Sequence, residues 1–188
     1  GMDVMQMEIS NRGYTYDIVS PGAMPLDLVD LISYSVIVVS ECQSNWVISD
    51  YNNARSHFED WVDTGGVMIH HVQRSMCVGG QQYPEVPGPI ISYQNRNVIE
   101  YSVDNPGHPI VFNLPGLGFG NPVTETVFAQ WVGIDAIIRD EVSFDPIYGE
   151  SFWGNGHFLL STVAYTEVWI QGGDLSGLLG NEIDYSMS

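Results

Sequence analysis

Continuous apolar runs alternate with amphipathic stretches through the first half of the chain. Residues 35–40 (SVIVVS) form a β-branched run, which predicts a strand buried on both faces. Residues 50–63 place their apolar side chains on one stripe and predict a helix that ends at a Gly-Gly pair. Residues 67–72 (VMIHHV) then predict a second buried strand. A strand, a helix and a strand in this order predict a right-handed βαβ unit in a parallel sheet, with the two strands as central neighbours.

The rest of the chain predicts further helices, strands and loops. Stretches rich in Gly and Pro at 73–89 and 113–122 predict long loops. Between and around them we expect helices at 3–12, 26–32 and 175–185, and extended segments at 14–19, 98–103, 123–132, 135–139 and 157–163. The pattern as a whole predicts an α/β, three-layer, flavodoxin-like fold with a mostly parallel central sheet.

Length and composition support one globular domain over residues 1–188. The chain has 188 residues and is 44% apolar, enough for one core and too short for two ordinary domains. No apolar run approaches the ~20 residues that span a membrane. Whether the domain is cut from a larger protein stays open.

The charge balance excludes several partners. Twenty-three acidic residues face five basic ones, all Arg, for a net charge of −18. Nucleic acids and anionic membranes are therefore not expected as partners, and a Schiff-base lysine is absent. Two cysteines, Cys42 and Cys77, form neither a disulfide framework nor a zinc motif, so an extracellular and a cytoplasmic location both stay open.

Three ordered stretches resemble the class I glutamine amidotransferase-like superfamily, and within it the ThuA-like (trehalose utilisation) branch. They are FEDWVDTGGVMIHHV at 58–72, VDNPGHPIVFNLP at 103–115, and residues 154–185 with GNGHFLLSTVAYTE and LLGNEIDY. The resemblance implies a strand before the first helix, which this chain lacks. The domain is therefore expected to be without its usual first strand, unless another segment or chain fills that place.

The departures from the family pattern concern catalysis. Amidotransferases use a Cys nucleophile, a His that activates it and a Glu that orients the His. The resemblance places Tyr165 where the His should stand, with Glu167 in the acid position, and a phenol with a pKa near ~10 is a poor general base. His70 and His71 occupy the nucleophile turn, and Cys77 comes several residues too late. We therefore expect no glutaminase activity.

Candidate site residues follow the predicted parallel strands, because ligands bind at the carboxyl edge of such sheets. Glu41, His71 and Glu167 are the candidates for an acid/base cluster or a metal site, against the alternative that a histidine only packs in the core. Three other histidines are expected to be structural or superficial: His108 holding its turn by a hydrogen bond, and His57 and His157 at the surface. The candidate ligand-binding residues around the cluster are Ser44, His70, Gln73 and Tyr165.

Two functions remain in competition. The first is a non-catalytic amidotransferase-like domain that acts as a ligand-binding or protein-interaction module, with a carbohydrate as one ligand class, because aromatic residues are frequent in its expected loops. The alternative is a ThuA-like enzyme acting on a carbohydrate through a His/Glu acid-base or metal site. No cofactor is expected, and assembly into a homo-oligomer stays open.

Overall fold

The protein is described from a computed structural model. The parts of the chain that the structure describes are residues 4–19, 31–41, 43, 45–72, 85, 92–114, 124–165 and 175–188.

The expected βαβ unit is present near the start of the sheet. Strand β1 (Val36–Val39) lies parallel to β2 (Val67–His71), with Val36 opposite Val67 and Val39 opposite His70. The prediction that these two runs are parallel neighbours is confirmed. All four residues of β1 are only half-buried, because β1 is the outermost strand of the sheet among the described residues. The expectation that β1 is central and buried on both faces is therefore wrong.

The connection between these strands is two helices rather than one. Helix α3 (Asn45–Asn53) and helix α4 (Arg55–Asp63) meet at Ala54, whose φ of −93° and ψ of 2° break the regular helix. Two asparagines, which are weak helix formers, end α3 directly before this break. The predicted helix at 50–63 thus begins earlier than expected and is interrupted.

The central sheet is mixed. It has six strands in the order β1-β2-β8-β7-β6-β4 among the described residues. Strands β1, β2 and β8 are parallel to one another, and the remaining pairings are antiparallel. The four strands not yet bounded are β4 (Tyr101–Val103), β6 (Asp135–Asp140), β7 (Pro146–Trp153) and β8 (Gly156–Ser161).

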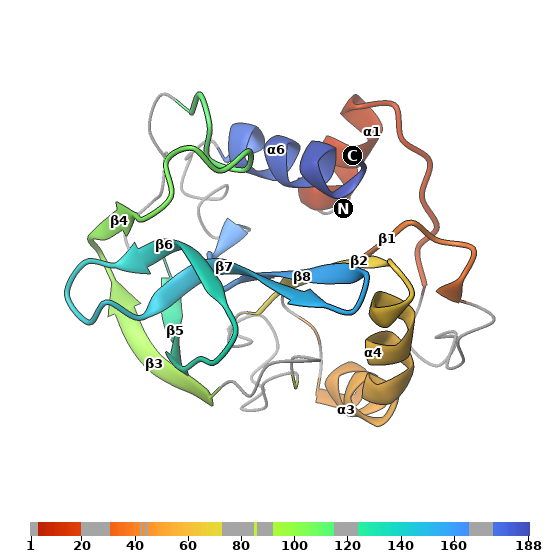
Figure 1. The fold of residues 1–188 in the computed structure, drawn as a ribbon, viewed down its shortest axis with the longest axis horizontal. Helices are drawn as coiled ribbons and strands as arrows, with labels where there is room; N and C mark the ends of the chain where they lie inside the picture. The colour runs from red at the N-terminus through yellow and green to blue at the C-terminus, as the bar shows by residue number, and fades with distance from the viewer. Residues whose placement is uncertain are drawn as a thin grey trace.

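A second, two-stranded sheet lies at one end of the molecule. Its antiparallel strands are β3 (Ser92–Val98) and β5 (Thr124–Gln130) (Figure 1). The predicted strand at 98–103 is divided, because Val98 ends β3 whereas residues 101–103 belong to the other sheet. Strand β7 was not predicted, since its polar and aromatic sequence shows no clean alternation, and residues 14–19 form no strand.

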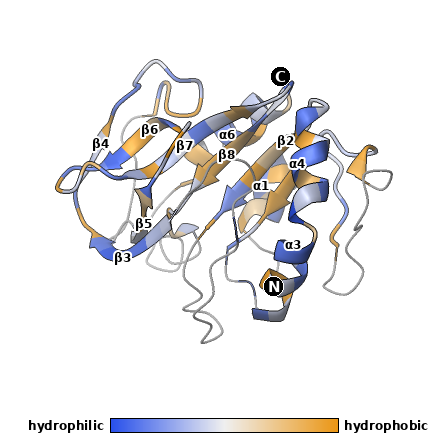
Figure 2. Ribbon diagram, turned by 60° about the horizontal axis from the view of Figure 1, so that its bottom comes forward, coloured by the Kyte–Doolittle hydropathy of each residue, from blue (hydrophilic) through white to orange (hydrophobic). Residues whose placement is uncertain are grey.

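Helices cover both faces of the central sheet. Helices α3 and α4 lie on one face, and α1 (Val4–Asn11) and α6 (Ser176–Ser186) lie on the other (Figure 1). Alternate residues of β8 serve the two layers: Leu159 joins the core beneath α6, and Phe158 joins the core beneath α4. Figure 2 shows hydrophobic colour along β2 and β8 in the middle and a hydrophilic β3 at the edge. The expected three-layer α/β fold is confirmed.

Candidate functional site

Three of the candidate residues meet at the carboxyl edge of the parallel strands. Glu41 follows β1, His71 ends β2, and Tyr165 follows β8. All three side chains are buried. The parallel pairing of β1, β2 and β8 brings these positions together, because parallel strands end at the same edge.

His71 is held by a carboxylate from helix α6. Its Nε2 lies 2.9 Å from Oε2 of Glu182, which is fully buried. The hydroxyl of Tyr148 on β7 donates a hydrogen bond to the other oxygen of the same carboxylate. A carboxylate is an acceptor only, so His71 and Tyr148 both serve it as donors. The three side chains form a hydrogen-bonded unit that ties α6 to the sheet.

Tyr165 is arranged as a packing group and not as a base. Its hydroxyl lies 3.2 Å from the Oγ of Ser161, and its ring stacks on that of His71 with centroids 4.3 Å apart. Burial raises the pKa of Tyr165 well above its usual 10, and the charges of Glu182 and Glu41 raise it further. The phenol therefore stays protonated at neutral pH and cannot activate a nucleophile.

Glu41 contributes negative charge to the same place. It is 7% exposed, and its charge acts on the pKa of the Tyr165 phenol, which puts the two side chains in electrostatic contact. The chain turns directly after it, where Gln43 Nε2 donates to the Glu41 carbonyl at 3.3 Å. The structure thus unites Glu41, His71 and Tyr165, and their roles in binding or catalysis stay predictions.

Of the other candidate residues, the structure describes only His70, which does not join this group. His70 is adjacent to His71 but points to the opposite face of β2, where its ring lies 5.2 Å from that of Tyr51. Burial lowers the pKa of His70 to about 3, and the neighbouring His71 lowers it as well, so the imidazole is neutral. The remaining candidates, Ser44, Gln73 and Glu167, lie outside the described residues.

Glu182 and Tyr148 were not among the predicted site residues. A signal for Glu182 was present, because it falls three and four residues after Leu179 and Leu178 on the apolar stripe of the predicted last helix. A carboxylate on such a stripe is buried and needs donors. Tyr148 had no such signal, since its strand was not predicted.

A second buried carboxylate lies on the same face of the sheet. Glu150 on β7 accepts a hydrogen bond from the Tyr185 hydroxyl at 2.9 Å and lies 3.2 Å from Nε2 of His108. His108 Nδ1 accepts the backbone N–H of Ile110 at 3.3 Å, so Nε2 carries the ring proton and donates it to Glu150. The expectation that His108 holds its turn by hydrogen bonding is confirmed.

His157 completes this second group. Its Nε2 lies 3.5 Å from Oε1 of Glu150, and its ring centroid lies 5.6 Å from that of Tyr185. Partial burial lowers the pKa of His157, although the Glu150 charge opposes this shift. The expectation that His157 lies at the surface is wrong, because the register of β8 turns it toward α6. Burial and Glu150 raise the pKa of Tyr185 to about 12.

Neither group is arranged as a metal centre. Among the described ranges, no set of three His, Cys, Asp or Glu side chains has the placement needed to hold a metal ion. No helix in the described part of the chain is long and apolar enough to cross a membrane.

Comparison with known proteins identifies the fold. No family model and no curated protein matches the sequence. Among solved structures, cytoplasmic protein STM3548 from Salmonella typhimurium matches with a TM-score of 0.68 at 16% identity, over 96% of this chain and 85% of that one. Cytoplasmic protein STM1381 from Salmonella typhimurium LT2 matches with a TM-score of 0.65 at 12% identity, over the same shares.

A larger enzyme contains a related unit. The cold-adapted beta-galactosidase from Rahnella sp. R3 matches with a TM-score of 0.51 at 11% identity, over 94% of this chain and 25% of that one. At these identities the matches define the fold alone. The chain shares with these structures an α/β fold, in which helices flank a mixed six-stranded core sheet.

Proposed function

We propose that this chain is an amidotransferase-like domain that binds a ligand at the carboxyl edge of its sheet and does not catalyse amidotransfer. The observation that carries the proposal is the state of Tyr165. Where the related fold needs a histidine base, this phenol is bonded to Ser161, stacked on His71 and protonated at neutral pH. A group held in this way can shape a pocket but cannot generate a thiolate.

A neutral, hydroxyl-rich ligand fits the chemistry of this edge, which supports a carbohydrate. Glu41 brings a carboxylate that can accept hydrogen bonds from sugar hydroxyls. Anions are disfavoured by the net charge of −18. Each described arginine is already paired with a carboxylate, as the contacts of Arg12, Arg55, Arg96 and Arg139 show. A beta-galactosidase is among the proteins with the related fold, which agrees with this ligand class.

The direct experiment is a binding screen with neutral sugars. Wild-type protein is titrated by calorimetry with a panel of neutral mono- and oligosaccharides, beside the variants Glu41→Gln and Glu141→Gln. Glu41→Gln keeps the shape of the side chain and removes the charge at the proposed site, whereas Glu141 is an exposed residue in the turn between β6 and β7. We expect a sugar that binds wild type and Glu141→Gln but binds Glu41→Gln at least about tenfold more weakly. Equal binding by all three proteins would show that the sugar does not bind at the carboxyl edge of the sheet.

A ThuA-like enzyme is the second candidate, and one observation favours it. His71 and Glu182 form a base and an orienting carboxylate at 2.9 Å, which is the geometry of a general acid-base pair. The same sugars are incubated with the protein, with and without added divalent metal, and the products are separated by chromatography. If wild type turns over a sugar and a folded His71→Asn variant does not, the protein is an enzyme and not only a binding module.

A further inference from the structure

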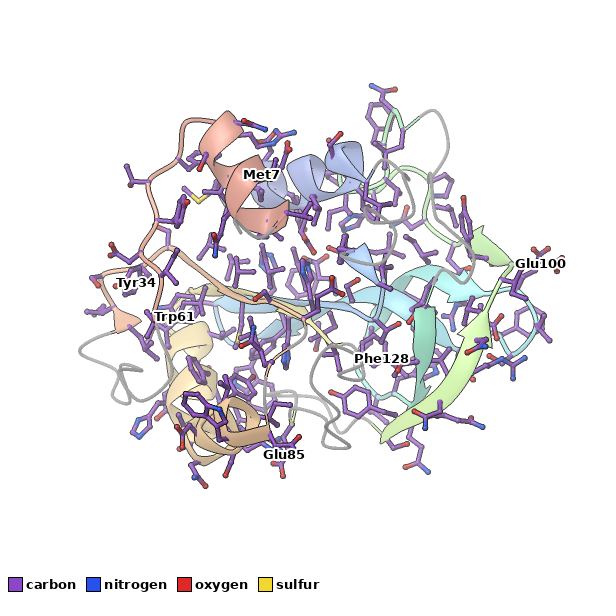
Figure 3. The ribbon with its side chains drawn as sticks, turned by 180° about the vertical axis from the view of Figure 1, so that it is seen from behind. Met7, Tyr34, Trp61, Glu85, Glu100 and Phe128 are labelled. Atoms are coloured by element: carbon purple, nitrogen blue, oxygen red, sulfur yellow. The ribbon has the colours of Figure 1, made fainter. Side chains whose placement is uncertain are left out.

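Three large apolar side chains are exposed together at one end of the molecule. Ile99 is 60% exposed, Val142 is 65% exposed and Phe144 is 67% exposed. They lie on two adjoining turns, β3–β4 and β6–β7, which are joined where the Glu141 N–H donates to the Glu100 carbonyl at 3.1 Å. Figure 3 shows Glu100 at the extremity of the molecule, far from Trp61 and the helical layers. We call Ile99, Val142 and Phe144 the apolar tip.

The β6–β7 turn, which carries Val142 and Phe144 of the apolar tip, is held by several hydrogen bonds. The Asp140 carboxylate accepts hydrogen bonds from the Val142 N–H at 3.2 Å, the Ser143 N–H at 3.1 Å and the Ser143 hydroxyl at 2.6 Å. Arg96 Nε lies 2.6 Å from the same carboxylate, which is almost fully buried. The apolar side chains are therefore presented on a fixed frame, so a partner would lose little entropy in ordering them.

Phe144 is held outward in an unfavourable backbone conformation. Its φ is +63°, in the left-handed region that Gly and Asn adopt readily and that a bulky residue avoids. The Phe144 N–H donates to the Asp140 carbonyl at 2.9 Å, and Arg139 Nη1 donates to the Phe144 carbonyl at 2.8 Å. The Phe144 side chain is nevertheless mostly exposed. Strain of this kind is characteristic of functional positions.

The surroundings of the apolar tip are acidic. Glu100 and Glu141 are both exposed beside it. The nearest cations are neutralised, because Arg96 pairs with Asp140 and Arg139 pairs with Asp104. An apolar centre with a charged rim is the usual anatomy of a protein interface, and the sign of the rim selects the partner.

We propose that the apolar tip is a docking surface for a basic polypeptide segment of another protein, which inserts an apolar side chain beside Phe144 and sets Lys or Arg against Glu100 and Glu141. A second copy of this chain fits poorly, since both copies carry a net charge of −18. An anionic membrane is disfavoured for the same reason. The surface is separate from the ligand site at the carboxyl edge, so the two proposals stand or fall independently.

The experiment uses three synthetic peptides of equal length: one amphipathic with Lys and Leu, one with Glu in place of Lys, and one with Lys and Ser. Binding to wild-type protein is followed by fluorescence anisotropy at low and high salt, beside Phe144→Asn and Val132→Asn. Asn tolerates the left-handed conformation, so Phe144→Asn removes the ring without adding strain. Val132 is the matched control, because it is 73% exposed on the turn between β5 and β6.

We expect the Lys/Leu peptide to bind wild type and Val132→Asn alike, to bind Phe144→Asn about tenfold more weakly, and to weaken as salt rises. The Lys/Ser and Glu/Leu peptides should bind more weakly than the Lys/Leu peptide. Equal loss in both variants, or equal binding of the Glu/Leu peptide, would overturn the proposal. So would self-association of the protein in sedimentation, or its binding to anionic vesicles, if Phe144→Asn abolished either one. Circular dichroism should show the same fold and an unchanged or higher melting temperature for Phe144→Asn.

Discussion

Two carboxylates lie under the same helix and differ in how completely they are enclosed. Glu182 projects from α6 toward the sheet and is fully buried between His71 and Tyr148. Glu150 projects from the sheet toward α6, and the groups around it, Tyr185 and His157, remain partly open to water. Each carboxylate is served by a tyrosine hydroxyl and a histidine ring.

Because the two carboxylates differ in enclosure, hydrogen bonds from the same kinds of donor should contribute more to the free energy of unfolding at Glu182 than at Glu150. Where water is excluded, losing the acceptor leaves the donors with no substitute. Where water can enter, it replaces part of what is lost. We therefore expect the Glu182 group to stabilise the packing of α6 on the sheet strongly, and the Glu150 group to stabilise the same interface less.

The largest expected effect comes from Glu182→Ala. The change leaves the His71 and Tyr148 donors without their acceptor in the interior, which should cost about 3–5 kcal/mol of the free energy of unfolding. Glu182→Gln keeps one acceptor oxygen and should cost less. Urea unfolding measures both variants, and a loss below about 1 kcal/mol for Glu182→Ala would show that the site is not sealed.

Glu150→Ala should have a smaller effect, about 1–3 kcal/mol by the same measurement. The His108 and Tyr185 donors lose their acceptor, but water can reach them from the side of His157. The comparison between the two carboxylates is broken if Glu150→Ala proves as costly as Glu182→Ala.

A third prediction concerns acid. The pKa of His70 is about 3 in the folded protein against 6.5 unfolded, so the unfolded chain binds the proton first as the pH falls. This histidine adds no pH dependence above pH 6.5, and below it stability falls by about 1.4 kcal/mol per pH unit until the pH nears the folded pKa. His70→Leu should therefore lose about 2 kcal/mol less than wild type between pH 7 and pH 5. An equal loss in His70→Leu and in wild type would contradict a neutral, buried His70.

The smallest effect distinguishes the two tyrosines. Tyr148→Phe removes a donor from the buried Glu182, and Tyr185→Phe removes one from the more open Glu150. Each should cost about 0.5–1.5 kcal/mol, with Tyr148→Phe the more costly of the two. Thermal melting of both variants under one buffer tests the order, and a reversed order would mean that enclosure does not set the weight of these bonds.

Strands β1 and β2 could be predicted because their signal is local. The β-branched run of β1 and the VMIHHV run of β2 specify parallel strands whichever partners they meet. Strand β7 could not be found in this way, since Glu150 and Gly149 interrupt any alternation and find their partners only in the folded sheet. The break at Ala54 follows the weak helix formers Asn52 and Asn53, which a hydrophobic period does not register.

The sequence could predict which edge of the sheet carries the candidate site, but not which side chains contact one another there. The order of strands puts Glu41, His71 and Tyr165 at one edge, which a topological rule anticipates. That His71 bonds to Glu182 required the register of α6 over the sheet, more than a hundred residues further along the chain. His70 and His71 illustrate the same limit. Adjacent residues of a strand point to opposite faces of the sheet, and the sequence alone does not show which of the two histidines faces which helices.

The proposal that this chain carries no amidotransfer chemistry has a direct test. Ammonia release from glutamine, measured for purified wild-type protein and Cys77→Ala side by side, tests it most directly. We expect both proteins to release no more ammonia than buffer, because Tyr165 is a protonated phenol and not a base. Sustained release by wild type that Cys77→Ala abolishes would contradict it.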